Sequence, residues 1–280
     1  MFENIVGLNK QKEILSKSID SGNISHAYLF FGNTGIGKLK LAKEFAKKIL
    51  KTDNLENHPD FKLITKKEDK KDILVEQIRT ELIDDVYIVP AAGERKVYII
   101  NNAESLNIAS QNTLLKTLEE PPRYITIILV SSNISAFLTT ILSRVNQIPF
   151  EGITNDELKQ YIYEKYSISF NDNMLEYING SIGKAEDIIN NNLQNKFKKV
   201  DELYAALNSM NTIESMKISQ AIEFGNDDLL DYLEYILYKN NKFNCIKLVE
   251  NAKKRLKFNG NYDIIIDSML LRIIDSIKEA

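Results

Sequence analysis

Short apolar runs alternate with amphipathic stretches over residues 1–150. Runs of about four to eight apolar or aromatic residues bounded by turn residues are typical of buried strands. Such runs predict strands at 27–31, 61–65, 96–100, 126–130 and 147–150. Because these runs are apolar nearly throughout, they favour a parallel sheet that is covered by helices on both faces.

Helical periodicity fills the intervals between these runs. Apolar residues between 39 and 50 recur on one stripe of a helix. Further helices are predicted at 78–86 and 109–118. Pro121 and Pro122 stop the last of these, since proline cannot continue a helix.

The pattern beyond Glu151 is helical only. It predicts helices at 154–165, 171–178 and 184–191, and apolar positions at helical spacing continue from 195 onward. Either Thr154 or Asn155 caps the first helix, with Glu157 behind it. The chain of 280 residues is therefore predicted to form three domains, an α/β domain at 1–150, a small helical domain at 151–193 and a helical domain at 194–280.

Composition and charge restrict the class of protein. Hydrophobic residues make up 44% of the chain and charged residues 27%, which is typical of a soluble globular protein. With 36 basic and 39 acidic residues, the net charge is -3. Proteins that hold duplex DNA alone usually carry a basic excess, so a partner is expected to supply much of the charge in any contact with nucleic acid.

Cysteine and histidine are too scarce for a disulfide or a zinc site. Cys245 is the single cysteine, and His26 and His58 are the two histidines. These residues cannot make an intramolecular disulfide or the usual Cys/His zinc site. We therefore expect no bound metal. No apolar stretch of about 18 residues and no signal peptide is present, so we expect a cytoplasmic protein.

The segment from Gly32 to Lys38, GNTGIGK, matches the phosphate-binding pattern G-x-x-x-x-G-K. In this pattern backbone N–H groups surround phosphates, the lysine adds positive charge and the following helix presents its N-terminus. The candidate ligands are Gly32, Gly35, Gly37 and Lys38, for ATP, ADP or another anion. Two alternatives stay open: a structural remnant of such a loop, or a glycine-rich turn with a surface lysine.

Three groups needed for hydrolysis are missing. Leu39 stands where a Ser or Thr hydroxyl would bind Mg²⁺. Asn101 and Asn102 follow a strand that usually ends in an acidic pair, and asparagine cannot act as a base near neutral pH. Glu104 could substitute for a missing acid, but it comes two residues late, and an exposed glutamate that starts a helix is the favoured interpretation. We therefore expect no useful hydrolysis by this chain and no required cofactor.

Four segments occur together in a fixed order: HAYLF at 26–30, HPD at 58–60, NTLLKTLEEPP at 112–122 and LSR at 142–144. This combination resembles the bacterial clamp-loader AAA+ family, and within it most closely the delta-prime type of DNA polymerase III subunit. The resemblance covers about residues 1–190, and 255–271 is a weaker match. It implies an α/β P-loop (AAA+) domain with a parallel sheet, a helical lid and an all-α C-terminal collar.

The resemblance also implies partners. Clamp loaders are rings of subunits that use ATP to place a sliding clamp on primed DNA during replication. The expected partners are the gamma/tau ATPase subunits and the clamp-opening delta subunit, with the sliding clamp and primed DNA as indirect ones and no membrane. A delta-prime-type subunit is a non-hydrolysing stator within a polymerase holoenzyme, without activity alone. The alternative is an active clamp-loader ATPase, whereas a P-loop kinase is disfavoured because the lid has no arginines.

Site residues follow from the same resemblance. Ser143 and Arg144 match the family's Ser-Arg motif, which makes Arg144 the candidate arginine finger for a neighbouring subunit. Val6 and Gly7 match a segment that packs on adenine, although a chain entry under the sheet explains them equally well. Gly183 stands where the ATPase subunits carry a nucleotide-sensing arginine. Apart from the resemblance, Arg144 would be interpreted as a surface arginine.

Overall fold

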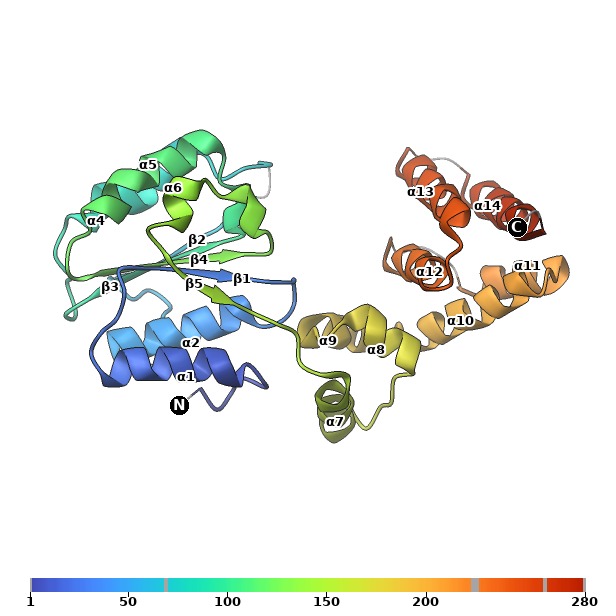
Figure 1. Cartoon of the computed structure of the whole chain (residues 1–280), viewed down its shortest axis with the longest axis horizontal. Coiled ribbons are helices and arrows are strands. Elements are labelled where there is room, and N and C mark those ends of the chain that lie inside the picture. The colour runs from blue at the N-terminus through green and yellow to red at the C-terminus, as the bar shows by residue number, and fades with distance from the viewer. Residues whose placement is uncertain (1, 68–69, 223–226, 259–260, 279–280) are drawn as a thin grey trace. The chain divides into compact units, whose positions relative to one another are not determined.

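The computed structural model describes residues 2–67, 70–222, 227–258 and 261–278. These residues contain a parallel sheet with the strand order β2-β3-β4-β1-β5 (Figure 1). The strands are β1 (Ala27–Phe31), β2 (Phe61–Ile64), β3 (Lys96–Asn101), β4 (Ile125–Ser131) and β5 (Asn146–Pro149). The predicted strands are thus confirmed, with ends that differ by one residue.

Helices cover both faces of the sheet, as the apolar strands predict (Figure 1). Side chains alternate between the two faces, so Tyr28 and Phe30 pack with one apolar cluster while Leu29 packs with the other. One face carries α1 (Asn9–Asp20) and α2 (Lys38–Leu50). The opposite face carries a continuous helical stretch formed by α3 (Val75–Ile78), a π-helical turn (Arg79–Ile83) and α4 (Asp84–Val86), together with α5 (Ile108–Glu119) and α6 (Thr139–Leu142).

Two of these helices were not predicted from the sequence. Helix α1 buries only Gln11 and Leu15, so its apolar stripe is weak. Helix α6 has four residues, which is too short for a periodic pattern. Both depend on the sheet for their stability, because short helices gain most of it from tertiary packing.

The remaining chain is helical. Its helices are α7 (Asn155–Tyr166), α8 (Asp172–Ile178), α9 (Ile182–Asn190), α10 (Gln194–Asn208), α11 (Thr212–Ile222), α12 (Asp227–Lys239), α13 (Phe243–Lys257) and α14 (Tyr262–Lys278). Of the two predicted caps, Thr154 caps α7, since its hydroxyl accepts from the N–H of Glu157 and the Glu157 carboxylate accepts from the N–H of Thr154. Over the residues described, none of the helices is long and apolar enough to cross a membrane.

The chain forms two compact units. One comprises Met1–Leu158 with Asn179–Gly183, and the other comprises Lys159–Ile178 with Lys184–Ala280. In the second unit, the rings of Tyr177, Phe197 and Tyr232 pack together, and the Tyr232 hydroxyl donates to Asp201. The predicted division at 1–150, 151–193 and 194–280 stays a prediction.

Candidate functional site

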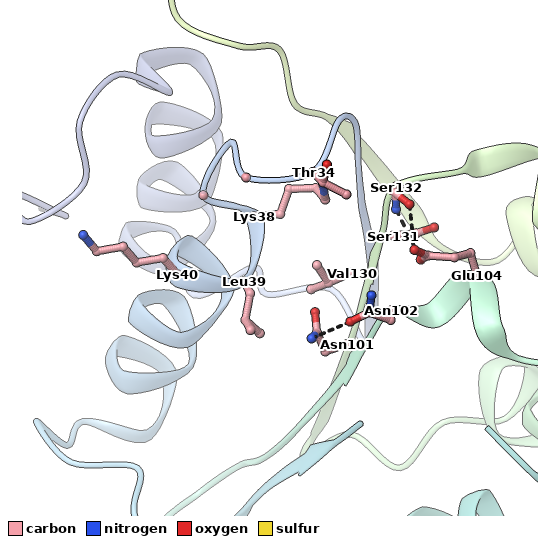
Figure 2. Close-up of a pocket in the computed structure, with 12 residues that line it drawn as sticks. Thr34, Lys38, Leu39, Lys40, Asn101, Asn102, Glu104, Val130, Ser131 and Ser132 are labelled. Carbon is pink, nitrogen blue, oxygen red and sulfur yellow. Dashed lines mark hydrogen bonds between the residues drawn. The ribbon is translucent and has the colours of Figure 1, made fainter. Parts of the chain in front are cut away.

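A pocket of about 320 Å³ lies where the first unit's central strands end. The loop between β1 and α2 forms one side, with Gly35 and Gly37 at φ values of +75° and +92°. The ends of β3 and β4 form the other side, because parallel strands end at the same edge of a sheet. The pocket is lined by Thr34, Gly35, Gly37, Lys38, Leu39, Lys40, Asn101, Asn102, Glu104, Val130, Ser131 and Ser132 (Figure 2).

Lys38 is buried at the start of α2. Its Nζ donates to the carbonyl oxygens of Gly32 at 2.6 Å and of Asn33 at 2.5 Å. Burial lowers the pKa of Lys38, and the negative charge of Glu104 partly offsets that effect. An anion that enters the pocket would therefore compete with the loop's own carbonyl groups for this ammonium.

The positions that would hold a metal and activate water carry no carboxylate or hydroxyl. Leu39 lines the pocket and packs against the apolar cluster beneath α2. Asn101 ends β3, and its amide donates to the side-chain oxygen of Asn102 at 2.8 Å (Figure 2). The arrangement offers hydrogen bonds to a ligand but no strong ligand for Mg²⁺ from these three side chains.

Glu104 is half-buried and faces the end of β4 (Figure 2). Its carboxylate accepts from the Ser132 hydroxyl at 2.6 Å and from the Ser132 N–H at 3.2 Å. Partial burial alone would raise the pKa of Glu104, but hydrogen bonds from Ser132 and Ser131 outweigh burial and lower the pKa. The interpretation of Glu104 as a merely exposed glutamate was therefore wrong, because this carboxylate connects the ends of β3 and β4.

Ser131 and Ser132 are pocket residues that sequence reasoning missed. The signal was present, since they follow the apolar run of β4. Polar residues at the carboxyl end of a parallel strand lie beside the equivalent residues of its neighbours. Their partner Glu104, in contrast, could not be identified without the fold.

Val6 and Gly7 are not among the residues that line the pocket of the loop. Gly7 contributes to a separate pocket of about 200 Å³ with residues 151–153. A Cβ on Gly7 would lie 2.3 Å from Ile153 Cγ2, so this segment packs closely against the chain that follows β5. Leu8 contacts the loop at Gly37, whose added Cβ would lie 3.6 Å from Leu8 Cδ1. The adenine contact of Val6 and Gly7 stays a prediction.

Arg144 lies on the turn between α6 and β5. Its Nη1 donates to the carbonyl oxygen of Thr140 at 2.8 Å and to the hydroxyl of Ser143 at 3.2 Å. Its Nη2 lies 2.8 Å from a carboxylate oxygen of Glu119, the last residue of α5. The Arg144 side chain keeps 33% of its surface exposed, so it is not packed into the core.

Arg144 and the phosphate-type loop lie at opposite ends of the paired strands β1 and β5. Strand β5 lies beside β1 and pairs with it in parallel (Figure 1). In this pairing Tyr28 is opposite Asn146 and Phe31 is opposite Pro149. Arg144 precedes this pairing, whereas the loop follows it. At about 3.3 Å per residue, the paired strands separate them by about 10 Å along the strand direction. The two features therefore cannot serve one bound phosphate in the same chain.

Comparison with known proteins gives consistent matches. The family model "DNA polymerase III, delta subunit" matches residues 7–154. The chain is 26% identical to DNA polymerase III subunit gamma of Buchnera aphidicola from Acyrthosiphon pisum, over 99% of the chain and 96% of that protein. It is 30% identical to DNA polymerase III subunit tau of Escherichia coli, over 58% of the chain and 27% of that protein.

Solved structures agree on the fold. A DNA polymerase III gamma-subunit-related protein from Thermotoga maritima superimposes with a TM-score of 0.53 and 17% sequence identity. The match covers 94% of this chain and 99% of that one. At this identity, the likeness supports the α/β domain followed by helices and carries no argument about chemistry.

Proposed function

The chain belongs to the DNA polymerase III delta-subunit family of clamp-loader proteins, and from that premise we propose that it is a non-hydrolysing stator of the delta-prime type. It acts in DNA replication as a clamp-loader subunit of DNA polymerase III. In the proposal, its partners are gamma/tau ATPase subunits and a clamp-opening delta subunit. The sliding clamp and primed DNA are reached through that complex.

The observation that carries the proposal is the character of three pocket residues. Leu39, Asn101 and Asn102 stand around the loop where a P-loop ATPase needs a Mg²⁺ ligand and an acidic pair. Neither leucine nor asparagine can accept a proton from water at neutral pH. Lys38, Gly35 and Gly37 line the pocket, which supports phosphate binding at this loop. ATP, ADP or another anion is therefore proposed to bind at Gly32, Gly35, Gly37 and Lys38 without being hydrolysed.

The second part of the proposal is that Arg144 acts on a nucleotide bound by a neighbouring subunit. A partly exposed guanidinium at the far edge of the sheet is remote from its own loop. Any nucleotide phosphate that it meets belongs to a neighbouring subunit. Guanidinium stabilises charge that develops on a transferred phosphoryl group, which is how an arginine finger accelerates hydrolysis in trans.

The test is a reconstituted clamp-loader complex that contains Arg144→Ala. We expect DNA-stimulated ATP hydrolysis at the neighbouring site and clamp loading to fall at least about tenfold. Arg79→Ala is the matched control, since Arg79 is an exposed arginine on the π-helical turn between α3 and α4. Unchanged hydrolysis and clamp loading with Arg144→Ala would remove the finger role.

An active ATPase is the second candidate. The complete G-x-x-x-x-G-K loop supports it, and the relatives at 26% and 30% identity are named gamma and tau. Turnover of Mg²⁺-ATP by the purified chain distinguishes the two candidates. If the purified chain hydrolyses ATP and Lys38→Ala abolishes that hydrolysis, the chain is an ATPase and the stator proposal is wrong.

A further inference from the structure

The guanidinium of Arg144 has three partners within the protein. Thr140 on α6 and the adjacent Ser143 accept from Nη1, and Glu119 at the end of α5 pairs with Nη2 at 2.8 Å. The Glu119 side chain keeps 49% of its surface exposed, so this ion pair lies at the protein surface. The contacts fix the direction of a side chain whose exposed part still faces solvent.

The backbone beneath Arg144 is already fixed. Ile141 and Val145, on either side of the turn, are buried in the apolar cluster of the α5 face. The N–H of Arg144 donates to the carbonyl oxygen of Ile141 at 2.9 Å. The remaining freedom of this residue is therefore in its long side chain, which carries large rotamer entropy.

Glu119 is in an unfavourable place for α5 itself. Helix α5 ends at Glu119, and Pro121 prevents its continuation. The carbonyl end of a helix disfavours a carboxylate and favours a cation such as Lys116, which lies in the same turn. The charge of Glu119 thus does not stabilise α5. Its counter-ion is Arg144.

We propose that Glu119 is a positioning residue for Arg144. Its carboxylate holds the guanidinium of Arg144 in one direction. Less side-chain freedom is then lost when the guanidinium binds a phosphate of a neighbouring subunit's nucleotide. This inference rests on the proposed function, because it assigns Glu119 a role only if Arg144 acts as a finger.

The experiment compares variants in the reconstituted clamp-loader complex, with DNA-stimulated ATP hydrolysis as the readout. We expect Glu119→Ala to lower kcat about three- to tenfold and to leave KM for ATP unchanged. Glu119→Gln should retain at least about half of the rate, because its amide oxygen still accepts from Arg144. Glu120→Ala is the matched control, since Glu120 is the next residue and exposed. Thermal unfolding of each variant shows that it is folded.

A double variant separates positioning from a general structural effect. We expect Glu119→Ala combined with Arg144→Ala to be no slower than Arg144→Ala alone. Additive losses, a change confined to KM, or equal rates for Glu119→Ala and Glu120→Ala would each overturn the inference. If Arg144→Ala reduces hydrolysis and Glu119→Ala does not, the inference fails and the proposed function stands. If Arg144→Ala has no effect, both fail.

Discussion

The backbone N–H of Gly183 donates a hydrogen bond to the carbonyl oxygen of Gly35, with 2.9 Å between nitrogen and oxygen. Gly183 is the second residue of α9, where helix N–H groups lack a partner within the helix. A Cβ at this position would lie 3.0 Å from the Gly35 oxygen and 3.1 Å from its Cα. Glycine at position 183 therefore allows a close backbone contact with the loop.

Gly183→Ala should weaken that contact. The added Cβ must displace the Gly35 backbone by a few tenths of an ångström, which lengthens a hydrogen bond of roughly 1 kcal/mol. We expect the amide of residue 183 to exchange about fivefold faster with solvent, measured by NMR hydrogen exchange. Gly93→Ala is the control, because nothing lies within 4 Å of a Cβ there. Equal exchange of the residue 183 amide in the two variants would contradict a specific contact.

Asp60 of the His-Pro-Asp segment should contribute to stability rather than to chemistry. It is 2% exposed, and its two carboxylate oxygens accept from the N–H groups of Ala91 at 2.7 Å and Ala92 at 2.8 Å. Asp60→Asn replaces one acceptor with a donor, so the N–H of Ala91 or Ala92 loses its buried acceptor. We expect the free energy of unfolding to fall by about 1–3 kcal/mol in urea denaturation.

The matched control for Asp60 is Asp53→Asn on the exposed loop nearby. Surface substitutions of this kind usually change stability by less than about 0.5 kcal/mol. Two variants of equal stability would show that the carboxylate of Asp60 does not hold residues 91–92.

The Glu104–Ser132 contact makes a pH prediction. The pKa of Glu104 is lowered in the folded protein, so its charge stabilises the fold above the ordinary value of 4.5. That contribution is lost as the pH falls from 4.5 through the lower folded pKa. Ser132→Ala removes the hydroxyl donor and should move the pKa of Glu104 up towards 4.5.

A carboxyl titration followed by NMR measures this shift directly. Ser135→Ala serves as the control, because Ser135 is exposed and its side chain is not a partner of Glu104. An identical Glu104 pKa in both variants would rule out Ser132 as the cause. Wild type should also lose more stability than Ser132→Ala between pH 4.5 and pH 3.

Mg²⁺ should not strengthen ATP binding by the wild-type chain. Leu39→Thr adds a hydroxyl and Asn101→Asp adds a carboxylate, which are the ligand types that Mg²⁺ shares with nucleotide phosphates. We expect calorimetry to show Mg²⁺-dependent tightening of ATP binding only in the double variant, by at least about fivefold. Leu39→Ala with Asn101→Asp is the control that keeps the carboxylate without the hydroxyl. The same dependence in wild type would contradict the proposed loss of the metal site.

Local sequence was sufficient for much of the fold because several signals act over a few residues. Apolar runs marked the five strands, and the proline pair marked the end of α5. The capping of α7 was also predictable, since Thr154 and Glu157 are only three residues apart. Helix α1 was missed because its burial depends on a few side chains and on the sheet above it.

The sequence by itself determined which side chains stand at positions 39, 101 and 102, because a leucine and two asparagines offer no hydroxyl and no carboxylate in any fold. Only the tertiary structure decided that Glu104 faces Ser132, that Arg144 meets Glu119, and that Gly183 touches Gly35. These pairs join residues far apart along the chain. Their contacts arise from strand order and helix placement, which follow from packing of the whole sheet rather than from any local pattern.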